Sequence, residues 1–459
     1  MNDPRSKARR DLAVAIHAAA VAGVDPRDAT QRAMAPRLID TRGSCWVIAL
    51  GKASGAMAAA AVELLHSRGI EVEGGVIVAP DAVVSPHPLV LSTLGDHPVP
   101  GSRSREAADT IGALVERIGG DDTVFVLLSG GATSLVAAPV NGVAERDLVW
   151  MFDALLTSGA DITTMNAIRK RFTRWGAGRL ARALAPARVY CLIVSDVVGD
   201  DIPSIGSGPC APDPRTSADV QALIERDGLE PFVPRPLREY LRNAASADDP
   251  PAPGDPAFDR VECAVILGNN DALEAAAAAA RGAGVSPIKI VGEPLIDDAT
   301  FTAQRIVDEL VRFREAGLPD DDGPSADAPF ACMLWGGETT VRLGAGKAAP
   351  GGRCQELALA AADALRSEGE RGEGLTLLAA GTDGRDGNTD AAGAVVDSTT
   401  WDAIIDAGRD AADDLVDHRS HASLDVVGAL IRTGLSGTNV GDVVVGIVER
   451  ANRQADLRA

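Results

Sequence analysis

Gly381-Thr-Asp-Gly-Arg-Asp-Gly-Asn-Thr-Asp-Ala-Ala-Gly393 is a polar stretch with three carboxylates and four glycines, and it follows the apolar run Leu375–Leu378. We predict that the apolar run is a short buried strand. Ligands bind at the carboxyl ends of strands in open α/β sheets. Asp383, Asp386 and Asp390 would repel one another unless a cation or well-placed hydrogen-bond donors lie between them. Mg²⁺ is commonly held by one or two carboxylates plus substrate phosphates. The stretch therefore predicts an α/β fold with an active-site loop, with a solvated acidic turn or a calcium loop as alternatives, although the EF-hand pattern is absent.

A strand followed by a glycine-rich turn also occurs near the N-terminus. Trp46–Leu50 is a predicted strand, and Gly51-Lys-Ala-Ser-Gly55 then leads into a predicted helix. This arrangement directs helix amides at an anion, although the turn is neither G-x-G-x-x-G nor a Walker A motif. Lys52 is one of only five lysines, and it stands where the helix dipole disfavours a cation. It is a candidate for binding an anion, and the alternative is an ordinary lysine at a helix start.

Two further predicted strands end in polar residues. The run Thr123–Leu128 continues into Ser129-Gly130-Gly131, whose backbone amides we expect to cradle a phosphate or carboxylate. Ser129 could instead be a nucleophile, but G-x-S-x-G is absent. Arg188–Val194 is followed by Asp196, which is a typical position for a site residue.

A basic segment stands out in this acidic protein. We predict one long helix over Asp161–Leu184, which includes Arg169 and Lys170. Either cation could meet an anionic substrate, or the segment could simply pair with the acidic surface. Arg169 is our candidate for the carboxylate of a small acid.

The composition excludes several classes of protein. The net charge is −21 and aromatic residues make up 3% of the 459 residues, which argues against DNA, RNA or anionic membranes as partners. The sequence contains no signal core and no apolar run long enough to span a membrane, so we expect a cytoplasmic protein. The six cysteines are scattered, with no C-x-x-C pair, and give no reason to expect disulfides.

The chain is long enough for two or three domains. Ser246–Phe258 and Pro319–Pro329 are rich in Asp, Pro and Ala, and we predict that both are linkers.

Taken together, these loops resemble the class II glycerate 2-kinase family, whose C-terminal half carries a MOFRL domain and some of whose members were labelled hydroxypyruvate reductase. The resemblance covers nearly the whole chain. The matching segments are Ala49-Leu-Gly-Lys-Ala53, Gly95-Asp-His-Pro-Val-Pro100, Leu128-Ser-Gly-Gly131, Asn166-Ala-Ile-Arg-Lys170, Ser195-Asp-Val-Val-Gly-Asp200, Gly206-Ser-Gly-Pro209, Gly268-Asn-Asn270, Gly336-Gly-Glu-Thr-Thr340, Gly352-Arg353, Gln355-Glu356, Gly381-Thr-Asp-Gly384, Thr389-Asp-Ala-Ala-Gly393 and Gly437-Thr-Asn-Val440. Cys354 departs from the family pattern, which usually has Asn there.

The resemblance implies two α/β domains with the active site in the cleft between them. The N-terminal domain, residues 5–245, would be Rossmann-like with a mainly parallel sheet. The C-terminal region, residues 260–459, would contain the MOFRL domain at about 329–448. The implied reaction is ATP-dependent phosphorylation of the 2-hydroxyl of D-glycerate with Mg²⁺, by a monomer or small homo-oligomer. Family catalytic roles fall on Lys52, Arg353 and Asp196.

The motifs supply further candidates for the site. Asp383 and Asp386 are the candidate metal ligands. The candidates for binding substrate or ATP are Ser129, Gly130, Gly131, Arg169, Gly336, Gly337, Glu338 and Asn439. The alternative enzyme is an NAD(P)H-dependent hydroxypyruvate reductase, which would need a strand-linked G-x-G-x-x-G that does not occur here. A sugar-acid sensor with a DNA-binding module is a third class, and the acidity of the chain counts against it.

Overall fold

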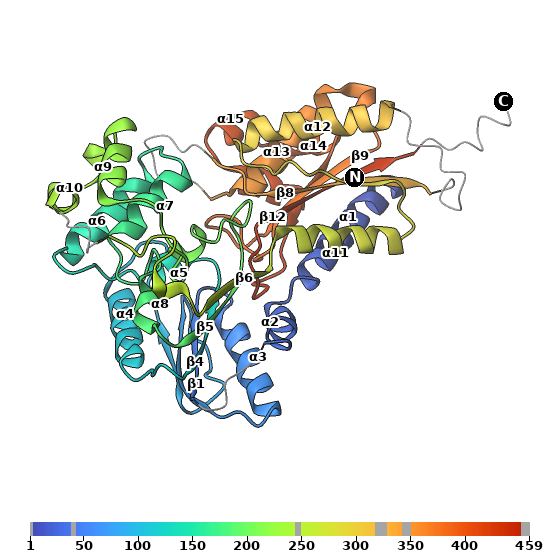
Figure 1. The fold of residues 1–459 in the computed structure, drawn as a ribbon. Coiled ribbons are helices and arrows are strands. Elements are labelled where there is room, and N and C mark those ends of the chain that lie inside the picture. The colour runs from blue at the N-terminus through green and yellow to red at the C-terminus, as the bar shows by residue number, and fades with distance from the viewer. Residues whose placement is uncertain (1–2, 38–42, 244–248, 317–327, 342–349, 451–459) are drawn as a thin grey trace, which may run out of the picture. The chain divides into compact units, whose positions relative to one another are not determined.

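Two sheets, each with its own helices, organise the chain (Figure 1). The computed structural model describes residues 3–37, 43–243, 249–316, 328–341 and 350–450. The chain divides into two units: the parallel-sheet unit, residues 26–267, and the mixed-sheet unit, residues 1–25 together with 268–459. Two α/β units are thus confirmed, but their boundaries differ from the predicted domains at 5–245 and 260–459.

The parallel-sheet unit contains six parallel strands in the order β3-β2-β1-β4-β5-β6. The strands are β1 (Cys45–Leu50), β2 (Val72–Ala79), β3 (Val90–Leu94), β4 (Thr123–Leu128), β5 (Arg188–Val194) and β6 (Val261–Leu267). Every residue of β1 and β4 is buried, as continuous apolar runs in a parallel sheet predict. The strand that we assigned to the start of the C-terminal region is β6, which pairs with β5 instead.

Helices cover both faces of this sheet and form an additional layer. Those packed on the sheet are α2 (Pro26–Met34), α3 (Ser54–Ser67), α4 (Ser102–Val115), α5 (Ala132–Leu135) and α8 (Arg179–Leu184). The layer has a hydrophobic core of its own and consists of α6 (Glu145–Leu156), α7 (Ile162–Arg171), α9 (Ser217–Arg226) and α10 (Arg235–Asn243).

The single basic helix predicted over Asp161–Leu184 is wrong. The segment forms α7 and α8, and Ala177 and Gly178 between them have φ of 55° and 77°. A right-handed helix cannot continue through residues in the left-handed region. The side chains of the basic run therefore point in different directions and do not share one face.

The mixed-sheet unit has strand order β11-β10-β9-β12-β8-β7, in which only β7 and β8 pair in parallel. The strands are β7 (Ile288–Ile290), β8 (Phe330–Gly337), β9 (Leu375–Gly381), β10 (Gly393–Asp397), β11 (Leu430–Ile431) and β12 (Asp442–Glu449). On one face lie α1 (Pro4–Ala22) and α11 (Asn269–Gly282), and on the other α12 (Ala299–Glu315) and α13 (Arg353–Ser367) (Figure 1). The remaining helices are α14 (Thr400–Asp406), α15 (Ala411–Val416) and α16 (Ser420–Val426).

Helix α1 belongs to the mixed-sheet unit, although we expected it in the N-terminal domain. It packs on α11, β9 and β12. Arg9 forms an ion pair with Glu449, and Arg10 reaches Asp397 at 2.8 Å. Partners more than 380 positions away decide the location of this helix, and its own amphipathic pattern does not reveal them.

Neither predicted linker marks the boundary between the units. The described part of Ser246–Phe258 leads directly into β6 within the parallel-sheet unit. Pro319–Pro329 lies mostly outside the described residues. Among the helices that the structure describes, none is long and apolar enough to cross a membrane.

Candidate active site

The first candidate residues lie where the order of the parallel sheet reverses, between β1 and β4. Leu50 and Leu128, the last residues of these strands, are paired neighbours, and ligands bind at such a switch point in α/β sheets. The turn after β1 carries Lys52, whose amide donates to the Gly130 carbonyl at 2.9 Å. The structure thus brings together two turns that are nearly 80 positions apart in the sequence.

Ser129 connects these two turns by hydrogen bonds. Its hydroxyl accepts a hydrogen bond from the Ala53 amide at 3.0 Å, and its own amide donates to Leu50 at 2.9 Å. Because the Ser129 amide is already used, the amides of Gly130 and Gly131 are the remaining candidates for binding an anion at this turn. Gly131 has φ of 85°, and a Cβ there would lie 3.1 Å from the ring of His97, so a larger residue would disturb this turn.

His97, in the segment after β3, is a neighbour of these turns. Its ring lies against Gly131, and partial burial, together with the positive charge of Lys52, lowers the pKa of His97. A neutral imidazole can therefore stand beside a charged Lys52 at neutral pH. The sequence shows that His97 lies in the Gly- and Pro-bearing segment Gly95–Pro100, but not that it contacts the turn after β4.

Asp196 follows β5, the strand next to β4, and is half-buried. It lies at the same edge of the sheet as Lys52 and Gly130, because all six strands run in parallel. Carboxyl ends of parallel strands meet at one edge, so a carboxylate and a cation are available there together.

Arg169 does not fit the predicted contact with a substrate. Its side chain is buried, donates to the Phe152 carbonyl at 3.0 Å and lies over the Phe152 ring at 5.0 Å. Burial lowers the pKa of Arg169 to about 10. Arg169 therefore packs within the helical layer, and we correct its assignment.

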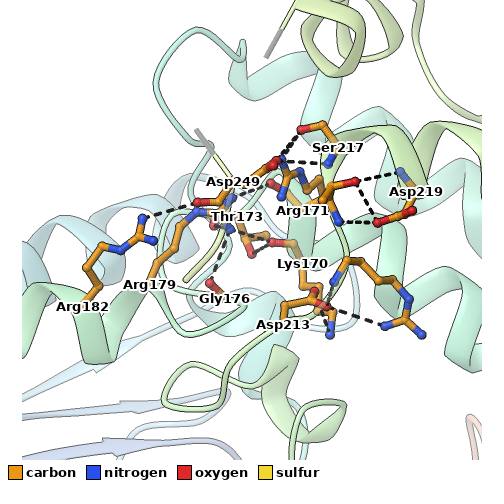
Figure 2. A network of polar contacts seen from close by, with 12 residues as sticks. Lys170, Arg171, Thr173, Gly176, Arg179, Arg182, Asp213, Ser217, Asp219 and Asp249 are labelled. Carbon is orange, nitrogen blue, oxygen red and sulfur yellow. Dashed lines mark hydrogen bonds and ion pairs between the residues drawn. The ribbon is translucent and has the colours of Figure 1, made fainter. Parts of the chain in front are cut away.

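The adjacent basic residues form a structural network (Figure 2). Lys170 makes a buried ion pair with Asp213 at 3.1 Å, and Arg171 pairs with Asp249. Arg179 donates to carbonyls at the end of α7, including Lys170 at 3.2 Å. The basic run is explained by holding α7, α8 and α9 together.

In the mixed-sheet unit, Arg353 is the first residue of α13 and contacts two carboxylates. Its Nε and Nη2 donate to the two oxygens of Asp442 at 2.6 and 2.9 Å, and its Nη1 lies 3.0 Å from Glu338. Asp442 begins β12 and Glu338 follows β8. Three segments far apart in sequence thus converge at one end of the mixed sheet.

The carboxylates fix both the charge and the orientation of Arg353. Burial acts to lower the pKa of Arg353, but Asp442 and Glu338 raise it well above its ordinary value. A bidentate contact also holds the planar guanidinium in one orientation. The side chain of Arg353 is 33% exposed, so it remains partly accessible from solvent.

Gly336 and Gly337 do not form the predicted anion-binding wall. Both lie inside β8, paired with Val443 and Asp442 of β12. A Cβ on Gly336 would come within 1.7 Å of the Asn269 side chain. Glycine is required here by close packing at the end of a strand, so we correct this assignment.

Asp386 caps a helix and is not placed to bind a metal. Its carboxylate accepts from the amides of Cys354 at 3.2 Å and Gln355 at 2.8 Å, and from the Gln355 side chain at 3.0 Å. Asp386 is 3% exposed, and burial raises its pKa to about 6 against the effect of these donors. Helix amides satisfy both oxygens, which explains the burial of this charge.

Asp383 remains as a single candidate ligand. It is half-buried, and one of its oxygens and one of Asp442 each lie 3.4 Å from the position of a Cβ on Gly381. Asn439 is half-buried in the chain segment before β12, and its side chain accepts from the Gly441 amide at 3.4 Å. Across the described ranges, His, Cys, Asp and Glu side chains form no group of three that could hold a metal ion.

Comparison with known proteins identifies the family. The family described as "Domain of unknown function (DUF4147)" matches residues 12–242, and the MOFRL family matches residues 331–442. The D-glycerate 2-kinase of Thermotoga maritima is 33% identical, over 98% of this chain and 100% of the relative. This chain belongs to the glycerate 2-kinase family.

Two other members of the comparison extend this result. An Agrobacterium vitis protein named "Putative hydroxypyruvate reductase" is 38% identical over 93% of this chain and 91% of its own length. The crystal structure of the Thermotoga maritima glycerate kinase is similar with a TM-score of 0.79 and 32% identity, over 96% of this chain and all of the other. In this glycerate 2-kinase family member, Lys52 and Arg353 each stand at the end of one sheet, one in each unit.

His17 is a buried histidine that interacts with Asp442, and we predict that it makes the stability of the protein depend on pH. Burial lowers the pKa of His17 to about 4, although the Ala380 backbone and Asp442 act to raise it. Between pH 6.5 and pH 4, His17 is mostly protonated in the unfolded chain and mostly neutral in the folded chain. The free energy of unfolding should therefore fall by about 2 kcal/mol between pH 7 and pH 5 from this residue alone.

Urea unfolding of the wild type and His17→Gln at both pH values measures this effect. The substitution removes the titrating imidazole. Asp386 titrates in both proteins, so its contribution to the pH dependence cancels when the two are compared. We expect a smaller loss of stability on acidification in His17→Gln. Equal losses in the two proteins would show that His17 does not titrate in this way.

Proposed function

We propose that this protein is a D-glycerate 2-kinase, which transfers the γ-phosphoryl group of ATP to the 2-hydroxyl of D-glycerate with Mg²⁺. The observation that carries the proposal is its similarity to the D-glycerate 2-kinase of Thermotoga maritima, which extends over 98% of this chain and all of that protein. Lys52 in the parallel-sheet unit and Arg353 in the mixed-sheet unit each offer a cation, which supports the proposal because phosphoryl transfer depends mainly on positioning and charge neutralisation.

Each residue of the site then has a role in this reaction. The amides of Gly130 and Gly131 hold ATP phosphates, and Lys52 offsets their charge. Arg353, oriented by Asp442, stabilises charge on the phosphoryl group in transit. Asp196 and Asp383 are the two carboxylates suited to accept the hydroxyl proton.

The residues fit a Mg²⁺ ion that arrives with the nucleotide. Mg²⁺ is usually held by one or two carboxylates and by substrate phosphates, and keeps several waters. Asp196 or Asp383 can supply such a carboxylate, whereas both oxygens of Asp386 already accept hydrogen bonds from amides of α13. When bound, Mg²⁺ would neutralise part of the charge on the β- and γ-phosphates.

Hydroxypyruvate reduction is the second candidate, and the name of the Agrobacterium vitis relative favours it. The strand order of the parallel sheet is also one that dinucleotide-binding folds use. However, the dinucleotide fingerprint G-x-G-x-x-G does not occur in the turn after β1. After Gly51 and Lys52, this chain has Ala53 where the second glycine would stand. One experiment separates the two: supply D-glycerate with ATP–Mg²⁺, or hydroxypyruvate with NADH, and follow both products. Turnover of hydroxypyruvate with NADH, without turnover of D-glycerate with ATP–Mg²⁺, would reject the kinase proposal.

ATP–Mg²⁺ should stabilise the protein against heat. A ligand present at a hundredfold excess over its Kd adds about 2.7 kcal/mol to the free energy of unfolding. We expect a higher melting temperature with millimolar ATP–Mg²⁺, and EDTA should remove most of the gain. An unchanged melting temperature in differential scanning fluorimetry would argue strongly against the kinase proposal.

A further inference from the structure

Trp150 differs from the other tryptophans of the chain in its exposure. All five lie in the described ranges, and Trp46, Trp175, Trp335 and Trp401 are at most 6% exposed. Trp150, in the middle of α6, is 50% exposed. An aromatic ring exposed on a helix that otherwise packs well is available to contact a ligand.

The ring borders a groove with the size of a small-molecule site. The hollow is shallow and open to solvent, with a volume of about 710 Å³. Two aliphatic side chains and three charged ones complete its lining: Val99, Val149, Glu145, Arg146 and Asp153. Two carboxylates and one guanidinium make the groove unfavourable for an anion but compatible with a neutral, flat group that carries hydrogen-bond donors.

The loop after β3 connects the groove to the phosphate cradle. Val99 lines the groove, and His97, two residues earlier, lies against Gly131 beside Lys52. The helix that follows this loop also contacts the groove, because Arg105 in the first turns of α4 pairs with Glu145 at 3.0 Å. The groove and the phosphate cradle therefore share one loop, within the same unit of the chain.

We infer that the groove binds the base of the nucleotide co-substrate, which stacks on Trp150. This rests on the proposed kinase function, because it requires a nucleotide whose phosphates lie at Lys52. The indole offers one face of a stack, Val99 and Val149 supply apolar contact, and Glu145 and Asp153 can accept from an exocyclic amino group such as that of adenine. Base–aromatic stacking tolerates many bases, so Trp150 contributes affinity more than discrimination.

Steady-state kinetics of Trp150→Ala tests the inference. Loss of one stacking contact should raise KM for ATP roughly 10- to 100-fold, with kcat and KM for D-glycerate nearly unchanged, and Trp150→Phe should restore most of the affinity. Leu156→Ala is the matched control, since Leu156 is 48% exposed on the same helix but does not line the groove. An unchanged KM for ATP in Trp150→Ala, or equal rises in both KM values, would overturn the inference.

Tryptophan fluorescence gives a second test that needs no turnover. Titration with ATP–Mg²⁺ should quench the red-shifted emission of the exposed indole in the wild type, and Trp150→Phe should lose this response. A response that persists in Trp150→Phe would overturn the inference. If the wild type responds to ATP–Mg²⁺ but does not phosphorylate D-glycerate, the proposed function fails while the nucleotide groove stands.

Discussion

Replacing Lys52 with alanine is expected to lower kcat by roughly 100-fold or more, because removal of one preorganised donor to a transition state costs about 3–4 kcal/mol. Lys52 stands at the reversal point of the parallel sheet, and its backbone is held against Gly130. Its exposed side chain contributes little to folding. The melting temperature of Lys52→Ala should therefore stay close to that of the wild type.

A second lysine supplies the control for this measurement. Lys7 is 74% exposed on α1, and its side chain forms an ion pair with Asp11. Lys7→Ala should therefore keep the wild-type rate. If Lys52→Ala retains a near-normal kcat in a folded protein, Lys52 is an ordinary residue at a helix start and the assignment fails.

Replacing Arg353 with alanine should reduce both the rate and the stability. The rate should again fall by roughly 100-fold or more, since a charge at the transferring phosphoryl group is lost. Asp442, which is 4% exposed, would lose its bidentate partner. Because Arg353 is itself partly exposed, we expect a loss of about 2–3 kcal/mol, below the value for a fully buried pair.

Arg353→Lys separates charge from geometry. Lysine keeps the positive charge but not the planar arrangement that contacts both oxygens of Asp442, so rate and stability should recover only in part. Arg366→Ala on the same helix is the control, because Arg366 makes exposed ion pairs away from Asp442. A fully active and fully stable Arg353→Ala protein would show that the contacts of Arg353 with Asp442 and Glu338 serve neither function.

Local sequence patterns predicted most strands of the parallel sheet. The bounds of β4 and β5 agree with the apolar runs from which they were predicted, because a strand buried on both faces needs a continuous apolar run and polar residues then mark its end. The sequence did not show that Lys52 and Ser129–Gly131 lie together, which depends on the pairing of β1 with β4.

Contacts between distant segments explain where the predictions were wrong. Helix α13 begins at Arg353 because Asp386 supplies the cap from more than 30 positions away, a contact that local sequence does not reveal. Arg169 was predicted to face a substrate, yet it packs on Phe152 of another helix. A carboxylate that caps a helix and one that binds a metal have the same residue type and similar neighbours in the sequence, so only the fold distinguishes them.

The most direct test of the account is the identity of the phosphorylated product. Purified protein with D-glycerate and ATP–Mg²⁺ should produce 2-phosphoglycerate, which enolase converts without phosphoglycerate mutase. The account predicts an immediate signal in the enolase-coupled assay and no change when mutase is added. A signal that appears only with mutase would mean transfer to the 3-hydroxyl, and no signal under either condition would contradict the assignment as a glycerate kinase.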